Sequence, residues 1–178
     1  MAPDDAIVVL PDDTYAHLVP GREIRAGGAR EAAEAFVGHA IAAVPAVSLP
    51  GRFERRNGEI RDGAHNPDGA RHLVEQLDRD DYTVVASILA DKDVDAMLRA
   101  LSRAGRRLVA TTSSSARALA AVDLAELAGR HFDHVEAVDD PVAAVARAHE
   151  LGEPVLVTGS LYLLGDLAQA EQRALWRG

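Results

Sequence analysis

From residue 68 to the C-terminus, apolar strand-like segments alternate with amphipathic helix-like segments. The segment YTVVASIL at 82–89 is a continuous run rich in β-branched residues, which is typical of a strand buried on both faces of a sheet. Further strands are expected at 107–112, 134–138 and 154–158, with helices around 68–77, 93–101, 116–128, 140–149 and 161–176. The short connections predict an α/β fold with a mostly parallel sheet and helices on both of its faces.

Residues 1–49 have a different character. Residues 6–10 and 14–19 are strand candidates, and a long alanine-rich helix is expected from about 29 to 44. A chain of 178 residues suffices for one domain plus such a short N-terminal segment.

The composition excludes several classes of protein. No apolar run approaches the length of a membrane span, and the acidic start at 1–5 (MAPDD) is unlike a signal peptide, so we expect a cytoplasmic protein without a membrane partner. The net charge of -9 argues against a nucleic-acid-binding surface. The absence of cysteine excludes disulfides and thiolate metal sites.

Polar loops follow several of the expected strands, at 62–67, 90–93, 111–115 and 158–160. Ligands of open parallel sheets bind outside the carboxyl ends of the strands. The four loops are therefore expected to share one edge of the sheet and to form one composite site.

The loop at 62–67 (DGAHNP) places a carboxylate, an imidazole and an amide in one turn before a helix. The pairs D-G and N-P are also common in ordinary turns, so this loop alone leaves both interpretations open. Lys92 is unusual because the chain has eighteen arginines and no other lysine.

The segment 62–67 resembles the signature of the C-terminal domain of dihydrofolate synthase/folylpolyglutamate synthase, in the Mur ligase superfamily. Three more segments resemble the same family in the same order: 50–54 (PGRFE), 89–93 (LADKD) and 157–166 (VTGSLYLLGD). The resemblance implies a Rossmann-like Mur ligase C-terminal domain over residues 50–178. It also implies that residues 1–49 correspond to the end of the family's central ATPase domain.

The activity that the resemblance implies is ATP-dependent amide formation. A carboxyl group of dihydropteroate or a folate is activated as an acyl phosphate and then joined to the amino group of L-glutamate. The implied cofactors are ATP and Mg²⁺, with the principal metal ligands in the ATPase domain and none in this chain. That ATPase domain would be joined in cis or supplied as a separate subunit.

On the nucleotide side, Arg52 resembles the family arginine that reaches the ATP phosphates. A guanidinium suits that role because it stays charged and can form bidentate hydrogen bonds with phosphate oxygens. Asp62 matches the family aspartate on the nucleotide side of the site. His65 matches the family histidine beside the reacting centre, and the resemblance implies a catalytic role for both residues. The alternatives are a surface arginine beside a linker and a structural histidine.

On the glutamate side, Lys92 resembles the lysine that meets the carboxylate of the incoming amino acid. Ser160 and Asn66 are expected to hydrogen-bond the same substrate. The alternatives are local charge balance between Asp91 and Asp93, and helix capping by Ser160. Arg117 resembles a family arginine only through a weak motif.

The chain departs from the family pattern in two ways. It contains no G-x-x-x-x-G-K-S/T phosphate loop, so it should not ligate anything alone. The run 56–61 (RNGEIR) has one aliphatic residue, which predicts a strand before Asp62 that is shortened or lies at an edge of the sheet.

Two functions stay open at this point. The first is a ligase C-terminal domain, present as a piece of a longer chain, as a subunit, or as part of a fusion with another folate enzyme. The second is a stand-alone domain that senses a nucleotide or glutamate without ligation. Residues for both substrate sides favour the ligase. A nicotinamide-binding domain is disfavoured because no G-x-G-x-x-G follows a strand.

Overall fold

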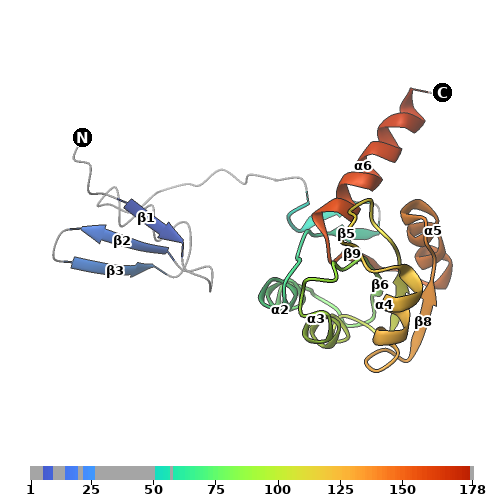
Figure 1. Ribbon diagram of the computed structural model, residues 1–178, viewed down its shortest axis with the longest axis horizontal. Coiled ribbons are helices and arrows are strands. Elements are labelled where there is room, and N and C mark those ends of the chain that lie inside the picture. The colour runs from blue at the N-terminus through green and yellow to red at the C-terminus, as the bar shows by residue number, and fades with distance from the viewer. Residues whose placement is uncertain (1–5, 10–14, 20–21, 27–50, 57, 177–178) are drawn as a thin grey trace. The chain divides into compact units, whose positions relative to one another are not determined.

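The computed structural model describes residues 6–9, 15–19, 22–26, 51–56 and 58–176 (Figure 1). The chain divides into two compact units, Met1–Val47 and Ser48–Gly178. In the first unit, an antiparallel sheet is formed by β1 (Ala6–Val9), β2 (Tyr15–Val19) and β3 (Arg22–Ala26). The helix predicted at 29–44 lies outside the described residues. The assignment of residues 1–49 to an ATPase domain stays a prediction.

The second unit is built on a six-stranded sheet in the order β4-β5-β9-β6-β7-β8. Every neighbouring pair is parallel except β4 and β5, which run antiparallel. The strands are β4 (Glu54–Arg56), β5 (Glu59–Arg61), β6 (Thr83–Ala86), β7 (Arg107–Ala110), β8 (His134–Ala137) and β9 (Val155–Thr158). The predicted α/β fold with a mostly parallel sheet is confirmed.

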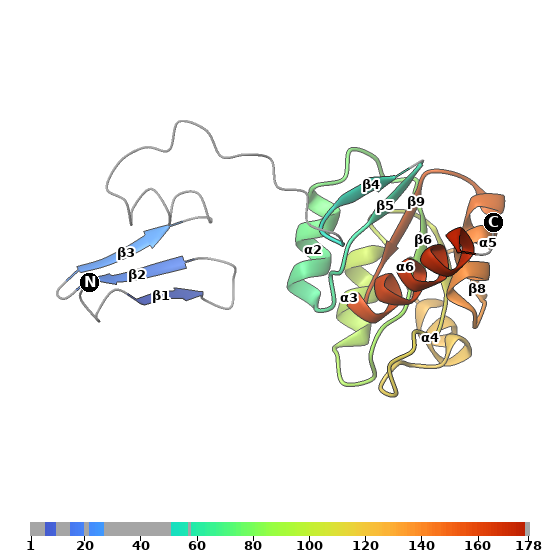
Figure 2. The same ribbon diagram turned by 90° about the horizontal axis from the view of Figure 1, so that it is seen from above.

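Helices cover both faces of this sheet, as predicted (Figure 2). They are α2 (Pro67–Glu75), α3 (Val94–Leu101), α4 (Ala121–Ala128), α5 (Pro141–Leu151) and α6 (Leu161–Leu175). Buried residues of α2, α3 and α4 belong to one hydrophobic cluster, and those of α5 and α6 belong to a second. Strand residues alternate between the two, since Val84 and Ala86 pack in the first cluster and Val85 in the second.

The strand before Asp62 is short, as predicted, but it is not an edge strand. β5 has three residues and pairs with β4 on one side and β9 on the other. The β4–β5 hairpin was not predicted, because its strands carry charged residues in place of an apolar pattern. Glu171 of α6 supports the hairpin by binding Arg56 and Arg61, each at 2.7 Å.

The prediction of a helix from residue 116 was wrong by five residues at its start. Residues 116–120 instead join the loop that follows β6, where Ala90 N donates to Arg117 O and Leu119 N to Ile88 O. α4 begins only at Ala121, whose N–H donates to Thr112 Oγ1 at 2.8 Å. Tertiary hydrogen bonds therefore override the helix propensity of the alanines. The same bonds end β6 at Ala86, before the predicted 89.

Within the part of the chain that the structure describes, no helix combines the length and apolar character that a membrane crossing requires.

Candidate functional site

The loop after β5 is organised by Asp62, which is only 9% exposed. Its Oδ2 accepts from Phe53 N and its Oδ1 from Ala64 N, both at 2.8 Å. The carboxylate thereby fixes the loop to the start of the domain, a role that the sequence did not reveal. Each carboxylate oxygen keeps a further lone pair, so the predicted nucleotide contact is chemically compatible and stays a prediction.

The same loop packs directly on α6. A Cβ at Gly63 would overlap Leu161 Cδ2, and Gly63 N donates to Gly51 O at 2.8 Å. Gly51 is buried, has a φ of +73°, and lies where the chain enters the second unit. Arg52, the predicted phosphate ligand, follows it and is exposed to solvent.

His65 is half-buried at the end of this loop, with its Nδ1 2.8 Å from Gly63 O. A carbonyl oxygen only accepts, so Nδ1 carries the proton and Nε2 of the neutral ring is an acceptor. The imidazole is thus oriented by the backbone. Asn66 is the N-cap of α2, and its Oδ1 accepts from Gly69 N at 2.7 Å. Its side-chain amide N–H groups are the part that the cap does not use.

Lys92 lies in the loop after β6, and its side chain is 31% exposed. Its Nζ is 3.5 Å from Asp91 Oδ2, and Arg117 Nη1 approaches the same oxygen at 3.0 Å. The alternative of local charge balance therefore describes part of the geometry. Asp93 does not join this pair, since its side chain caps α3 by accepting from Ala96 N.

Ser160 follows β9 and caps α6, where its Oγ accepts from Tyr162 N at 3.1 Å. It is only 1% exposed, so a ligand reaches its hydroxyl only if neighbouring side chains move. Nearby, Thr158 Oγ1 is buried and has no hydrogen-bond partner among the described residues. Buried hydroxyls without a partner are uncommon in proteins.

The four polar loops do share one rim of the sheet, because they follow the parallel strands β5, β9, β6 and β7. Hydrogen bonds connect neighbouring loops along this rim. Asp62 N donates to Val157 O, and Ser87 N donates to Thr158 O. Ser87 Oγ donates to Ser113 Oγ at 3.0 Å and accepts from Ser113 N at 3.1 Å. The predicted residues thus lie along one continuous edge, which we call the carboxyl rim.

Two features of the carboxyl rim were not predicted. The buried pair of Ser87 and Ser113 was overlooked because the run of serines at 113–115 resembles a flexible loop. Asp166 of α6 accepts from Ser114 N at 2.7 Å. Its only sequence signal is its position as the last residue of the motif at 157–166.

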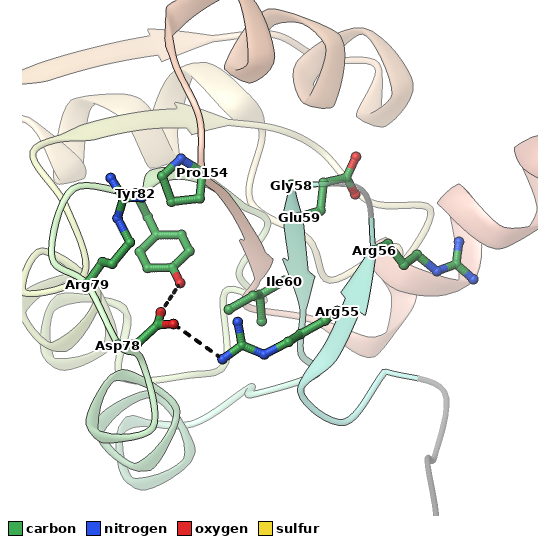
Figure 3. Close-up of a pocket in the computed structure, with 9 residues that line it drawn as sticks. All are labelled: Arg55, Arg56, Gly58, Glu59, Ile60, Asp78, Arg79, Tyr82 and Pro154. Atoms are coloured by element: carbon green, nitrogen blue, oxygen red, sulfur yellow. Dashed lines mark hydrogen bonds and ion pairs between the residues drawn. The ribbon is translucent and has the colours of Figure 1, made fainter.

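A pocket of about 410 Å³ lies at the opposite end of the sheet, between the β4–β5 hairpin and residues 78–82 (Figure 3). On one wall Tyr82 donates to Asp78 Oδ1 at 3.0 Å, and Arg55 lies 3.8 Å from Asp78 Oδ2. The other two lining arginines are also paired, Arg56 with Glu54 and Glu171, and Arg79 with Asp81. The pocket is therefore charge-balanced and separate from the carboxyl rim.

Among the described residues, no three acidic or histidine side chains gather in an arrangement that would hold a metal ion.

Comparison with known proteins connects this domain to ligases. A family model described as "Mur ligase, glutamate ligase domain" matches residues 51–161. The dihydrofolate synthase/folylpolyglutamate synthase of Mycobacterium tuberculosis is 42% identical over 94 residues, which are 49% of this chain and 19% of that protein. The folylpolyglutamate synthase of Lacticaseibacillus casei is 33% identical over 114 residues, which are 62% of this chain and 26% of that protein.

The solved structures agree. The M. tuberculosis folylpolyglutamate synthase complexed with ADP and AMPPCP superposes with a TM-score of 0.69 and 31% identity. The match covers 79% of this chain and 37% of that one. The chain therefore spans less than half the length of these relatives. It belongs to the Mur ligase family, as a glutamate ligase domain of the kind that forms the C-terminal part of folylpolyglutamate synthase-like ligases.

Proposed function

We propose that this chain supplies the glutamate side and part of the nucleotide side of an ATP-dependent ligase that adds L-glutamate to dihydropteroate or a folate. The observation that carries the proposal is the carboxyl rim itself. It brings His65, Lys92 and the loop fixed by Asp62 to one edge of a Mur-type sheet. Exposed Arg52 follows Gly51, whose carbonyl oxygen accepts a hydrogen bond from this loop.

The residues present fit ATP only in part. Exposed Arg52 offers a permanently charged, forked donor suited to phosphate oxygens. The backbone-oriented His65 and the Asp62 loop lie on the same side of the domain. When bound, ATP supplies the phosphoryl group that activates the acceptor carboxylate. The Mg²⁺ ligands and the phosphate loop would belong to an ATPase domain, in cis or as a separate subunit.

On the glutamate side, the main proposed contact is between Lys92 and the substrate carboxylate. Its ammonium already faces the Asp91 carboxylate at 3.5 Å, a distance too long for a strong hydrogen bond and suited to exchange for a substrate carboxylate. Asn66 would add a hydrogen bond, and Ser160 would add another once the side chains that cover its hydroxyl move. A positioned amine and a neutralised carboxylate are what attack on an acyl phosphate requires.

Binding to the 178-residue chain tests this proposal by NMR titration with Mg-ATP and with L-glutamate. We expect weak, millimolar affinities, because half of the nucleotide site is absent. ATP should shift signals around Arg52 and His65, and glutamate those around Lys92. Arg52→Ala and Lys92→Ala should each abolish one response. Arg106→Ala, which removes an exposed arginine near the amino end of β7, is the matched control.

Micromolar or tighter ATP binding to the isolated chain would instead favour the sensor alternative. Glutamate shifts scattered away from the carboxyl rim would contradict the site assignment.

Catalysis is tested in a complete ligase that carries this domain behind its ATPase domain. His65→Ala and Lys92→Ala should each lower turnover about 100-fold, in the range of a lost general acid–base group or transition-state donor. Circular dichroism should show an unchanged fold. Near-normal turnover in both variants would reject their proposed roles.

A further inference from the structure

Asp166 connects two parts of the carboxyl rim that are far apart in the sequence. It lies on α6, six residues after the helix cap Ser160, which corresponds to about 9 Å along a helix axis. Its Oδ2 accepts from Ser114 N at 2.7 Å, across 52 residues of sequence. The bond fixes the loop that follows β7 to the helix that begins beside β9.

The far side of that loop is fixed to the loop that carries Lys92. Ser113, the neighbour of Ser114, is held by the buried Ser87 hydroxyl at the end of β6. Three residues beyond Ser114, Arg117 O accepts from Ala90 N at 2.8 Å. The Arg117 side chain then binds Asp91 Oδ2, the oxygen that Lys92 also approaches.

The loop at 113–117 is therefore a bridge with two anchored ends. One end is bonded to α6 through Asp166, and the other is bonded to the loop that carries Asp91 and Lys92. Two successive backbone N–H groups, those of Ser113 and Ser114, are bound by side chains from two different elements. Such double anchoring limits the freedom of the bridge more than either bond alone.

The charge of Asp166 is unfavourable for ligand binding on this rim. A carboxylate near a site for anionic substrates repels them, and the chain is already acidic, with a net charge of -9. What the carboxylate provides is a strong acceptor, since hydrogen bonds to charged groups are about twice as strong as neutral ones. This contrast favours a positioning role over a direct contact with substrate.

We propose that Asp166 is a positioning residue that holds the 113–117 bridge and thereby sets the separation between Lys92 and the Ser160 end of α6. This inference rests on the proposed function, because that separation matters only if both ends meet glutamate. It assigns Asp166 to the affinity for the amino-acid substrate and leaves the nucleotide side unaffected.

The test compares three variants of the 178-residue chain. Asp166→Ala removes the acceptor, and Asp166→Asn removes the charge but keeps an acceptor oxygen. Glu126→Ala, at an exposed position of helix α4, removes a carboxylate that has no side-chain hydrogen bond among the described residues and serves as the matched control. The readouts are hydrogen exchange at the Ser114 amide and NMR titrations with L-glutamate and with Mg-ATP.

We expect Asp166→Ala to accelerate exchange at Ser114 and to weaken glutamate binding about fivefold, the equivalent of one lost hydrogen bond. Asp166→Asn should fall within about twofold of wild type, as should ATP binding in every variant. In a complete ligase, Asp166→Ala should raise the KM for glutamate while kcat and the KM for ATP stay near wild type.

Equal glutamate affinity in wild type and Asp166→Ala would overturn the inference while leaving the proposed function intact. A parallel loss of ATP binding with a lowered Tm would also overturn it, because it would indicate a general structural role. If glutamate leaves the Lys92 and Ser160 signals of the wild-type chain unchanged, the proposed function fails and this inference fails with it.

Discussion

The two ends of the parallel sheet are held together by different kinds of interaction. At the carboxyl rim, buried hydroxyls and backbone N–H groups connect the loops, as in the pair of Ser87 and Ser113. At the amino end, exposed ion pairs predominate, such as Arg79 with Asp81, whose side chains are 56% and 54% exposed. Exposed ion pairs contribute little to stability, whereas a buried donor that loses its partner costs about 1–3 kcal/mol. The loops of the carboxyl rim are therefore joined by directional hydrogen bonds between buried groups.

The largest effects should come from two glycines, one at each end. An alanine Cβ at Gly159 would lie 2.6 Å from Ser87 O, at a φ of +97°, and one at Gly105 would overlap the carbonyl oxygen of Tyr82. Each Gly→Ala change should lower the free energy of unfolding by about 3 kcal/mol or more, because backbone must shift. Urea denaturation measures this loss.

Gly165 provides the control within α6, where nothing lies within 4 Å of an added Cβ. Gly165→Ala should raise the free energy of unfolding by about 0.5–1 kcal/mol through helix propensity. Stability losses of similar size in all three variants would contradict the packing argument.

Removal of two buried hydroxyls of the carboxyl rim should have an intermediate effect on stability, and the effect should differ between them. Ser87→Ala leaves the Ser113 N–H without its partner and should cost about 2 kcal/mol. Thr158→Val removes a buried hydroxyl that has no partner among the described residues, so it should be neutral or slightly stabilising. Chemical denaturation of both variants checks this difference, and an equal cost would show that Thr158 also has a partner in solution.

The smallest effect concerns the amino end and depends on pH. His149 Nε2 lies 2.9 Å from Glu59 Oε1, and its Nδ1 lies 3.0 Å from Glu153 Oε1. The hydrogen bond to Glu59 raises the pKa of His149 above its ordinary 6.5; partial burial opposes this shift, and Glu153 adds to it. The folded state thus favours the imidazolium. The resulting stabilisation is complete below the unfolded pKa and disappears as the pH rises through the folded one.

His149→Gln should therefore cost more stability at about pH 5.5 than at about pH 8.5. The difference should be under about 1 kcal/mol, since Glu59 also binds Arg61 Nε and keeps a cationic partner when His149 is neutral. Thermal unfolding across this range measures it. A larger cost at the alkaline end would show that the sign is wrong.

The alternation of apolar strand-like and amphipathic helix-like segments predicted the buried strands and helices. It did not predict the hairpin, whose strands are rich in charged residues. Strands such as β6 and β9 were found because all four residues of each are buried and apolar or β-branched. The β4–β5 hairpin was missed because its support comes from Glu171, more than 100 residues later in the chain. Local sequence carries no information about such a partner.

The candidate site, like the fold, could be predicted from the sequence only in part. The strand ends predicted which loops share the carboxyl rim, since topology follows from the order of the elements. What each side chain does there depends on tertiary contacts. Asp62 and Asn66 bind backbone N–H groups, Ser160 caps a helix, and Asp166 reaches a loop from another strand. Helix capping by Ser160 was one of the interpretations that the sequence left open. The contacts of Asp62 with Phe53 N and of Asp166 with Ser114 N join separate segments, and no spacing rule contains them.

Because the chain has a single lysine, this side chain can be labelled selectively and observed by NMR. Lys92 is the single lysine and is about one-third exposed beside Asp91. Reductive methylation with ¹³C-formaldehyde would thus label one side chain besides the α-amino group. Its methyl resonance would follow the charge on a substrate carboxylate directly, without assignment of the remaining spectrum. Reductive methylation does not modify arginine, so no second side chain would carry the label.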